Sequence, residues 1–256
     1  MSDTEDDGLD LFQEPKDYYQ PEKEPTKVEH KTLAGKVLQL NLVGHNPLWG
    51  HFLWNAGRTI ADYLEIHKED LEGRSVLELG AGAGLPSLIC ALNGASSVLV
   101  TDYPDADLIE NLEKNCAILP EPRTCQAAGY LWGASTEDLK ARLPESEREA
   151  GFDVLILADL LFNHSEHAKL VSSVQQTLKK DGDAQALVFF TPYRPWLLEK
   201  DLAFFDLARD GGFSVEKILE VEMDKVMFEE DPGDELLRRT VFAYRLRWSE
   251  AALKTG

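Results

Sequence analysis

The sequence predicts an α/β protein with a single doubly wound, mainly parallel seven-stranded sheet and an N-terminal strand/helix extension. Short apolar segments alternate with amphipathic ones along most of the chain, and short loops connect them. The first core segment runs straight into a glycine-rich turn, and the next one ends on a carboxylate. A strand, a tight turn, a helix and a second strand tipped with an acid are typical of a nucleoside-binding unit.

The chain divides into an acidic start and one large domain. Residues 1–30 hold three prolines and few aliphatic side chains, so we expect a mobile tail there. Residues 31–256 are predicted to form the domain, with the extension at 31–72 and the core at 73–250. No internal repeat or change of composition marks a second domain.

The elements follow from hydrophobic periodicity and from turn residues. In the extension we expect a strand at 36–43, which alternates with a period of two, and a helix at about 54–66. The core is predicted to contain strands at 75–80, 97–101, 124–127, 153–158, 185–191, 213–222 and 239–248, and helices at 85–93, 105–117, 135–149, 165–179 and 196–210.

The glycine-rich turn favours one nucleoside cofactor over another. Gly80, Gly82 and Gly84 allow a sharp turn and let a ligand approach the backbone, while Asp102 is placed to accept hydrogen bonds from ribose hydroxyls. Nicotinamide enzymes use the spacing G-x-G-x-x-G, but here the position of the third glycine holds Leu85. Glu78 before the turn would repel a phosphate and tolerate an ammonium or a sulfonium. The turn therefore favours S-adenosylmethionine over NAD.

The composition of the chain limits the classes of binding partner that we expect. The chain has 256 residues and a formal net charge of −20, which argues against a nucleic-acid substrate and suits a basic protein or a small cation. An acidic surface that only keeps the protein soluble explains the charge equally well. Three cysteines without metal-ligand spacing indicate reduced thiols. A polar N-terminus and the lack of a membrane-length apolar run predict a cytoplasmic protein with no membrane partner.

Around these motifs the chain resembles the seven-β-strand methyltransferases, whose fold is Rossmann-like, and within them the lysine methyltransferases of non-histone proteins. The resemblance covers roughly residues 35–248. It rests on the segments Glu78–Gly84, Thr101–Pro104, Phe52–Trp54, Leu131–Gly133 and Ala158–His164. It implies cofactor contacts from Trp54, Glu78, Gly80, Ala81, Gly82, Asp102, Trp132 and Ala158. For both tryptophans, simple core packing is the alternative interpretation.

The methyl acceptor is expected beside the loops after the fourth and fifth core strands. An amine must lose its proton before it attacks, so a useful pocket is acidic at its mouth and aromatic or neutral-polar within. Asp159, Asn163, His164, Tyr193 and Trp196 come from these loops. Asn163 is placed to accept a hydrogen bond from the amine, Tyr193 to wall the channel, and His164 to take up a proton. A helix cap at His164 and a rigid turn at Tyr193 are the competing interpretations.

The resemblance also suggests a substrate. Within the group, the chain is most similar to the fungal protein N-terminal and lysine methyltransferases that act on translation elongation factor 1-alpha. This similarity implies an N-methyltransferase for the N-terminal segment of that protein. The alternatives are a small-molecule N-methyltransferase, with nicotinamide as an example, and a non-catalytic cofactor-binding protein. We expect a monomer, and no metal site, since His164 and His167 fit no metalloprotease signature.

Overall fold

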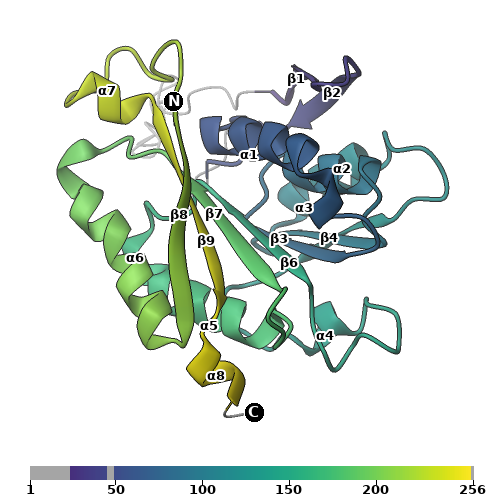
Figure 1. Ribbon diagram of the computed structural model, residues 1–256. Coiled ribbons are helices and arrows are strands. Elements are labelled where there is room, and N and C mark those ends of the chain that lie inside the picture. Colours follow the sequence, from purple (N-terminus) through teal and green to yellow (C-terminus); the bar gives the residue numbers. More distant parts are fainter. Residues whose placement is uncertain (1–23, 45–48, 255–256) are drawn as a thin grey trace, which may run out of the picture.

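The computed structural model describes residues 24–44 and 49–254 (Figure 1). Its centre is a sheet of seven strands, which confirms the predicted fold class. In sheet order the strands are β5 (Cys125–Gly129), β4 (Ser97–Asp102), β3 (Ser75–Leu79), β6 (Val154–Ala158), β7 (Gln185–Phe190), β9 (Thr240–Trp248) and β8 (Phe213–Glu222). Only β9 runs antiparallel to its neighbours β7 and β8, so the sheet is mainly parallel.

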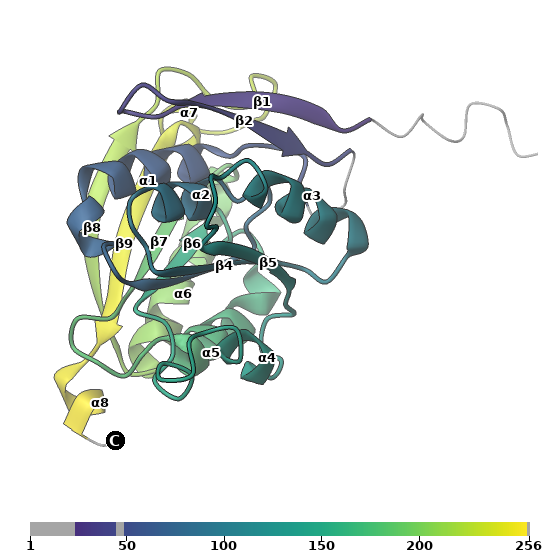
Figure 2. The ribbon, with the colours of Figure 1, turned by 90° about the vertical axis from the view of Figure 1, so that its right-hand side faces the viewer.

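Helices cover both faces of the sheet, as a doubly wound topology requires. Figure 2 shows α1 (Asn55–Ile66), α2 (Leu85–Leu92) and α3 (Ala106–Cys116) above the sheet. The same view shows α4 (Glu137–Lys140), α5 (His167–Thr177) and α6 (Leu198–Asp210) below it. Two short helices, α7 (Glu235–Arg238) and α8 (Glu250–Lys254), flank β9 along the chain. Within the described ranges, no helix is both long and apolar enough to cross a membrane.

The strands divide the apolar side chains between two cores. Because successive strand residues point to opposite faces, Val76 packs with the helices α1–α3 while Leu77 packs with α5 and α6. The three cysteines, Cys90, Cys116 and Cys125, are buried in the first core as free thiols. The second core contains the aromatic side chains of Phe190, Phe204 and Phe205.

An N-terminal hairpin lies over the α1–α3 layer (Figure 2). The predicted strand is present as β2 (Val37–Leu42), and it pairs antiparallel with β1 (Thr26–Lys31), which the sequence did not predict. Residues 26–30 therefore belong to a strand and not to the expected tail, whereas residues 1–23 lie outside the described residues. Only Val28 and His30 of β1 turn inward, so its alternation is too short to stand out from the acidic segment before it.

The predicted polar helix at 135–149 is wrong. Only Glu137–Lys140 is α-helical, and turns follow it. Pro144 lies in the middle of the predicted span, where it lacks a backbone N–H and would clash with the preceding turn. Leu139 and Leu143 are buried without a continuous helix between them. The remaining core helices are present, although α5 and α6 each begin after a short 3₁₀ turn.

Asn115 of α3 fastens the hairpin to the glycine turn. Its Oδ1 accepts hydrogen bonds from the backbone N–H of Asn41, at 2.8 Å, and from the side-chain amide of Asn41, at 2.9 Å. Its Nδ2 donates to the carbonyls of Asn41 and Ala83, both at 2.9 Å. The Asn115 side chain is 1% exposed, so these bonds use its whole capacity away from water.

Replacing Asn115→Ala should destabilise the protein by about 3 kcal/mol, because it leaves buried backbone groups of Asn41 and Ala83 without partners. Urea unfolding of the variant measures this loss. Glu113→Ala on the same helix is the control, since Glu113 is exposed and should change the free energy of unfolding by less than about 0.5 kcal/mol. Equal stability of the two variants would contradict the anchoring role.

Candidate functional site

A cavity of about 400 Å³ opens where β3, β4 and β6 end. This is the edge at which doubly wound sheets bind ligands, because the loops after neighbouring strands diverge there. All eight residues predicted to contact the cofactor line it: Trp54, Glu78, Gly80, Ala81, Gly82, Asp102, Trp132 and Ala158. The sheet therefore brings together residues from five separate segments of the chain.

The glycine turn forms the floor of this cavity. Gly80 and Gly82 have φ angles of 61° and 56°, a left-handed conformation that residues with a Cβ rarely adopt. A Cβ on Gly80 would lie 2.7 Å from the Cδ2 of Leu160, so the close packing also requires glycine. A Cβ on Gly82 would meet nothing within 4 Å. Its backbone thus faces open space in which a ligand fits.

Asp102 holds the turn from the end of β4. Its Oδ2 accepts a hydrogen bond from the N–H of Gly82, and its Oδ1 accepts one from the N–H of Tyr103, each at 2.7 Å. Each carboxylate oxygen keeps a second lone pair, so both can still accept from vicinal ribose hydroxyls. Burial raises the pKa of Asp102, although the two backbone hydrogen bonds oppose that shift.

Glu78 lines the cavity but is less free than the sequence suggested. Its Oε2 accepts hydrogen bonds from both the N–H and the hydroxyl of Ser87, at the start of α2. Burial raises the pKa of Glu78 to about 8, despite the hydrogen bonds from Ser87. Glu78 therefore secures α2 against β3 and presents a carboxyl group whose ionised form a nearby cation would stabilise.

Two tryptophans, Trp54 and Trp132, line the cavity. Trp132 approaches Gly80 closely, and the loop that carries it is held by a hydrogen bond from the N–H of Gly133 to the Oγ of Ser173, at 2.9 Å. Trp54 is the residue immediately before α1, and its ring N–H donates to the carbonyl of Trp49 at 3.2 Å. Both side chains are half-buried and line the cavity, and Trp132 also packs against the second core.

A second cavity of about 280 Å³ adjoins the first. The two share Trp49, Trp54, Asp159 and Phe162 in their linings, so they meet at these side chains. Aromatic rings dominate the second cavity, since Trp54, Tyr193 and Phe228 pack with centroids 5.1 to 5.9 Å apart. Its charged lining consists of Asp159, Asp201, Asp231 and Arg194.

Asp159 stands at the junction of the cavities. It follows β6 with a φ of 55°, which is uncommon for a residue other than glycine. Its Oδ1 accepts a hydrogen bond from the N–H of Thr191 at 2.7 Å, and its Oδ2 accepts one from the N–H of Ala56 at 3.0 Å. Burial raises the pKa of Asp159 to about 7 in spite of these bonds.

Tyr193 lines the second cavity, whereas Asn163, predicted to accept a hydrogen bond from the amine, lines the first cavity and not the second. The hydroxyl of Tyr193 donates to Asp159 at 3.4 Å and accepts from the N–H of Asn55 at 3.4 Å, so its ring walls the second cavity. Asn163 lines the first cavity, and its Oδ1 accepts a hydrogen bond from the hydroxyl of Ser165 at 3.2 Å.

The prediction that His164 faces the acceptor is not supported by its position. Its Nε2 lies 2.6 Å from the Oδ1 of Asp201, and the ring lines neither of the two cavities. His164 therefore reaches the second cavity only through Asp201. His167 is buried with its Nε2 2.8 Å from the carbonyl oxygen of Leu161, and Trp196 lies exposed outside both linings.

Sequence reasoning missed several lining residues of the second cavity. Phe228 and Asp231 come from the loop between β8 and α7, far along the chain from the motifs that carry the cofactor turn. The side chain of Arg238 in α7 fixes this loop by donating to the carbonyl of Phe228 at 2.7 Å. A lone aromatic residue in an acidic loop gives no periodic pattern, so nothing local marked it.

The Asp102→Ala variant should bind S-adenosylmethionine about 10- to 100-fold more weakly, because a charged acceptor for the ribose is lost. Isothermal titration calorimetry measures the dissociation constant. Asp102→Asn keeps one acceptor oxygen and should show a smaller loss, while the exposed Asp107→Ala should bind like the wild type. Unchanged affinity in Asp102→Ala would refute the ribose assignment.

Sequence comparison gives a family for this site. Residues 33–210 match the family described as lysine methyltransferase. The protein N-terminal and lysine N-methyltransferase efm7 of Emericella nidulans is 50% identical over 257 residues, which cover 98% of this chain and 99% of the relative. The protein of the same name from Schizosaccharomyces pombe is 41% identical over 251 residues, which cover 96% and 98% of the two chains.

Solved methyltransferase structures share the fold at low sequence identity. TYW2 of P. horikoshii, in complex with MeSAdo, gives a TM-score of 0.51 at 17% identity over 88% of this chain and 72% of that chain. Magnesium protoporphyrin IX methyltransferase of Synechocystis, with bound SAH, gives 0.50 at 16% identity over 75% and 80% of the two chains. Together with the glycine turn and its acidic partners, these matches show that the chain belongs to the lysine methyltransferase family and is a methyltransferase whose cofactor is S-adenosylmethionine.

Proposed function

We propose that the protein methylates the N-terminal α-amine and an adjacent lysine of translation elongation factor 1-alpha. The main observation that supports protein N-methyltransferase activity is the pair of adjoining cavities that meet at Asp159 and Trp54. The names of the relatives, N-terminal and lysine N-methyltransferases, support both kinds of amine. The elongation factor itself is supported by the family resemblance of the sequence.

The first cavity has the chemistry that the cofactor needs. S-adenosylmethionine supplies an electrophilic methyl group on a sulfonium. Asp102 would hold the ribose, Trp132 would cover the adenine, and Gly82 would let the ligand lie against the backbone. The buried carboxyl group of Glu78 would face the positive charge of the methionine portion. Glu78, Gly82 and Asp102 are already positioned by hydrogen bonds within the protein, and the loop that carries Trp132 is held by the hydrogen bond of Gly133.

The second cavity has the chemistry that an amine needs. Its aromatic walls exclude water, which lowers the pKa of a bound ammonium, and its carboxylates attract the ammonium as it enters. Three aspartates against one arginine leave the lining negative. A narrow, acidic and aromatic channel suits a chain end or an extended lysine.

Asp159 is the residue best placed to take the proton. Its pKa of about 7 lies close to that of a free α-amine, at about 7.7 to 8.0, so transfer from an N-terminal ammonium to the carboxylate costs little. The pKa of a lysine ammonium is about 10.4, so desolvation among the aromatic rings must first lower this pKa. The neutral nitrogen then attacks the methyl group in line, and the proton stays on Asp159 until water removes it. Tyr193 orients this carboxyl group through its hydroxyl.

The Asp159→Asn variant should lose about 100-fold in kcat with an N-terminal peptide, since asparagine cannot accept the proton. Asparagine tolerates the left-handed conformation at this position but keeps only one of the two backbone hydrogen bonds, so circular dichroism of the variant checks the fold. Methylation rates from pH 6 to 9 test the assignment: the wild-type rate should fall as the pH drops through about 7, where Asp159 becomes protonated. The methylation rate of Asp159→Asn should not show this fall near pH 7.

The same variant should depend less on pH for its stability than the wild type does. A carboxyl group whose pKa is raised on folding favours the folded state while it is protonated, and this contribution is lost as the pH rises from the unfolded pKa to the folded value of about 7. Asparagine does not titrate, but it can accept from only one of the two backbone N–H groups that Asp159 binds. The Tm of Asp159→Asn should therefore lie below that of the wild type at pH 5, and the difference should shrink by several degrees at pH 8. Asp206→Asn, in an exposed carboxylate of α6, is the control and should change neither Tm nor rate. A Tm difference that is the same at pH 5 and pH 8 would contradict the proposed cost of burial.

Elongation factor 1-alpha from cells that lack the enzyme should carry an unmodified N-terminus. Incubation of their lysate with the enzyme and radiolabelled S-adenosylmethionine should label one protein band, and mass spectrometry should find the methyl groups on its N-terminal peptide. Label in a different protein would overturn the proposed target. Label only in the acid-soluble fraction would favour a small-molecule acceptor. The predicted cytoplasmic location and monomeric state remain predictions.

A further inference from the structure

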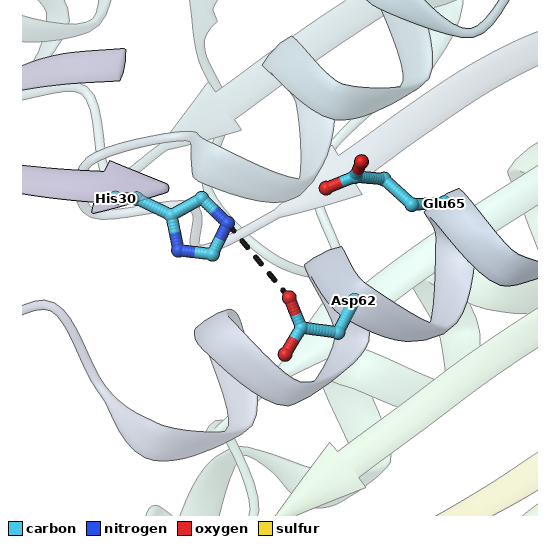
Figure 3. A group of neighbouring side chains, drawn as sticks. All are labelled: His30, Asp62 and Glu65. Atoms are coloured by element: carbon cyan, nitrogen blue, oxygen red, sulfur yellow. Dashed lines mark ion pairs between the residues drawn. The ribbon is translucent and has the colours of Figure 1, made fainter. Parts of the chain in front are cut away.

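Three ligand-type side chains converge away from both cavities, between the hairpin and α1. They are His30 of β1 and the pair Asp62 and Glu65 of α1 (Figure 3). One donor atom from each lies within 4.8 Å of the other two. Figure 3 shows the imidazole of His30 pointing at the carboxylate of Asp62, with Glu65 facing the same space.

His30 is the unusual member of this group. The residue is only 6% exposed, yet its Nε2 is buried without a hydrogen-bond partner. The Nε2 lies 3.9 Å from the Oδ1 of Asp62, which is too far for a hydrogen bond. Buried polar atoms are nearly always satisfied, so an orphaned imidazole nitrogen aimed at two carboxylates points to a missing ligand.

The spacing suits an ion between the side chains. Across a tetrahedral Zn²⁺ with bonds near 2.1 Å, two ligand atoms lie about 3.4 Å apart. The gap between His30 and Asp62 is only slightly wider, at 3.9 Å, so a small side-chain rotation closes it.

The carboxylate of Glu65 is held in place from outside the site. The Oε1 and Oε2 of Glu65 accept hydrogen bonds from the N–H groups of Leu33 and Ala34, at 3.1 and 3.3 Å, in the turn that follows β1. Glu65 thus already joins α1 to the hairpin, and each oxygen keeps a lone pair for a metal. Asp62 is half-exposed, which gives an ion a route of entry.

The charges around the site restrict the kind of cation. Arg58, one turn earlier on α1, acts on both His30 and Asp62, so only one net negative charge remains when the carboxylates are ionised. That charge is too small to hold a cation by attraction alone. Coordination by the imidazole must contribute, and imidazole suits Zn²⁺ and related transition metals better than Mg²⁺ or Ca²⁺.

We propose that His30, Asp62 and Glu65 form a binding site for one divalent transition-metal ion, with Zn²⁺ as the preferred cation, that joins β1 to α1. Three protein ligands leave a coordination position for water. The site does not depend on the proposed methyl transfer, and its role is to hold the N-terminal hairpin on the domain.

Calorimetry with ZnCl₂ on the full chain, stripped of metal by a chelator, tests this site. We expect one ion per chain, a rise in Tm on binding, and an affinity that falls about 10-fold or more in both His30→Gln and Asp62→Asn. Circular dichroism of each variant checks the fold. Asp62→Asn serves as the second variant because its half-exposed side chain is less important for folding than the buried His30.

His67→Gln is the matched control. His67 lies 3.6 Å from Glu69, its side chain is half-exposed and it does not belong to the cluster of His30, so this variant should bind Zn²⁺ like the wild type. Co²⁺ substitution should give a visible spectrum without a thiolate-to-cobalt band, which excludes the cysteines as ligands. Absence of saturable Zn²⁺ binding, equal affinity in Asp62→Asn and the wild type, or a thiolate band would each overturn the proposal.

Discussion

The buried carboxylate of Asp159 links chain segments that line the two adjoining cavities. The left-handed backbone after β6 turns its side chain back into the protein, where it accepts hydrogen bonds from the first turn of α1 and from the end of β7. Trp54 immediately precedes α1, and Tyr193 follows β7 by a few residues. Two of the three packed aromatic rings that line the second cavity therefore depend on the position of a single side chain.

This arrangement costs stability. Burial raises the pKa values of Asp159 and Glu78 to about 7 and about 8, so both acids are partly protonated near neutral pH when no cation is close. A positively charged cofactor beside Glu78 and an incoming ammonium beside Asp159 would each favour the ionised forms. The two carboxyl groups whose ionisation costs the most therefore lie where a bound cation would compensate for that cost, which is typical of functional sites.

The sequence predicted the cofactor half of the site better than the acceptor half. The glycine turn, Asp102 and the strands around them form a local pattern within about thirty residues, and all eight predicted cofactor contacts line the first cavity. The second cavity is assembled from distant loops, so no local pattern marked Phe228. His164 lies outside the lining because its ring pairs with Asp201 of α6. Periodicity also failed at 135–149, where Pro144 prevents the helix. Local patterns predict elements, but the long-range partners of polar side chains lie beyond them.

The helix α1 connects the two sites. Its first turn is fixed by Asp159, while Asp62 and Glu65 near its end face the hairpin. Between them Ile60 and Leu64 are fully buried in the core, so the helix moves as a rigid, packed element. A cation bound by His30 would therefore stabilise the hairpin without bending α1 or displacing Trp54. The metal would act on the stability of the N-terminal segment and would leave the hydrogen bonds of Asp159 to α1 and to the end of β7 unchanged.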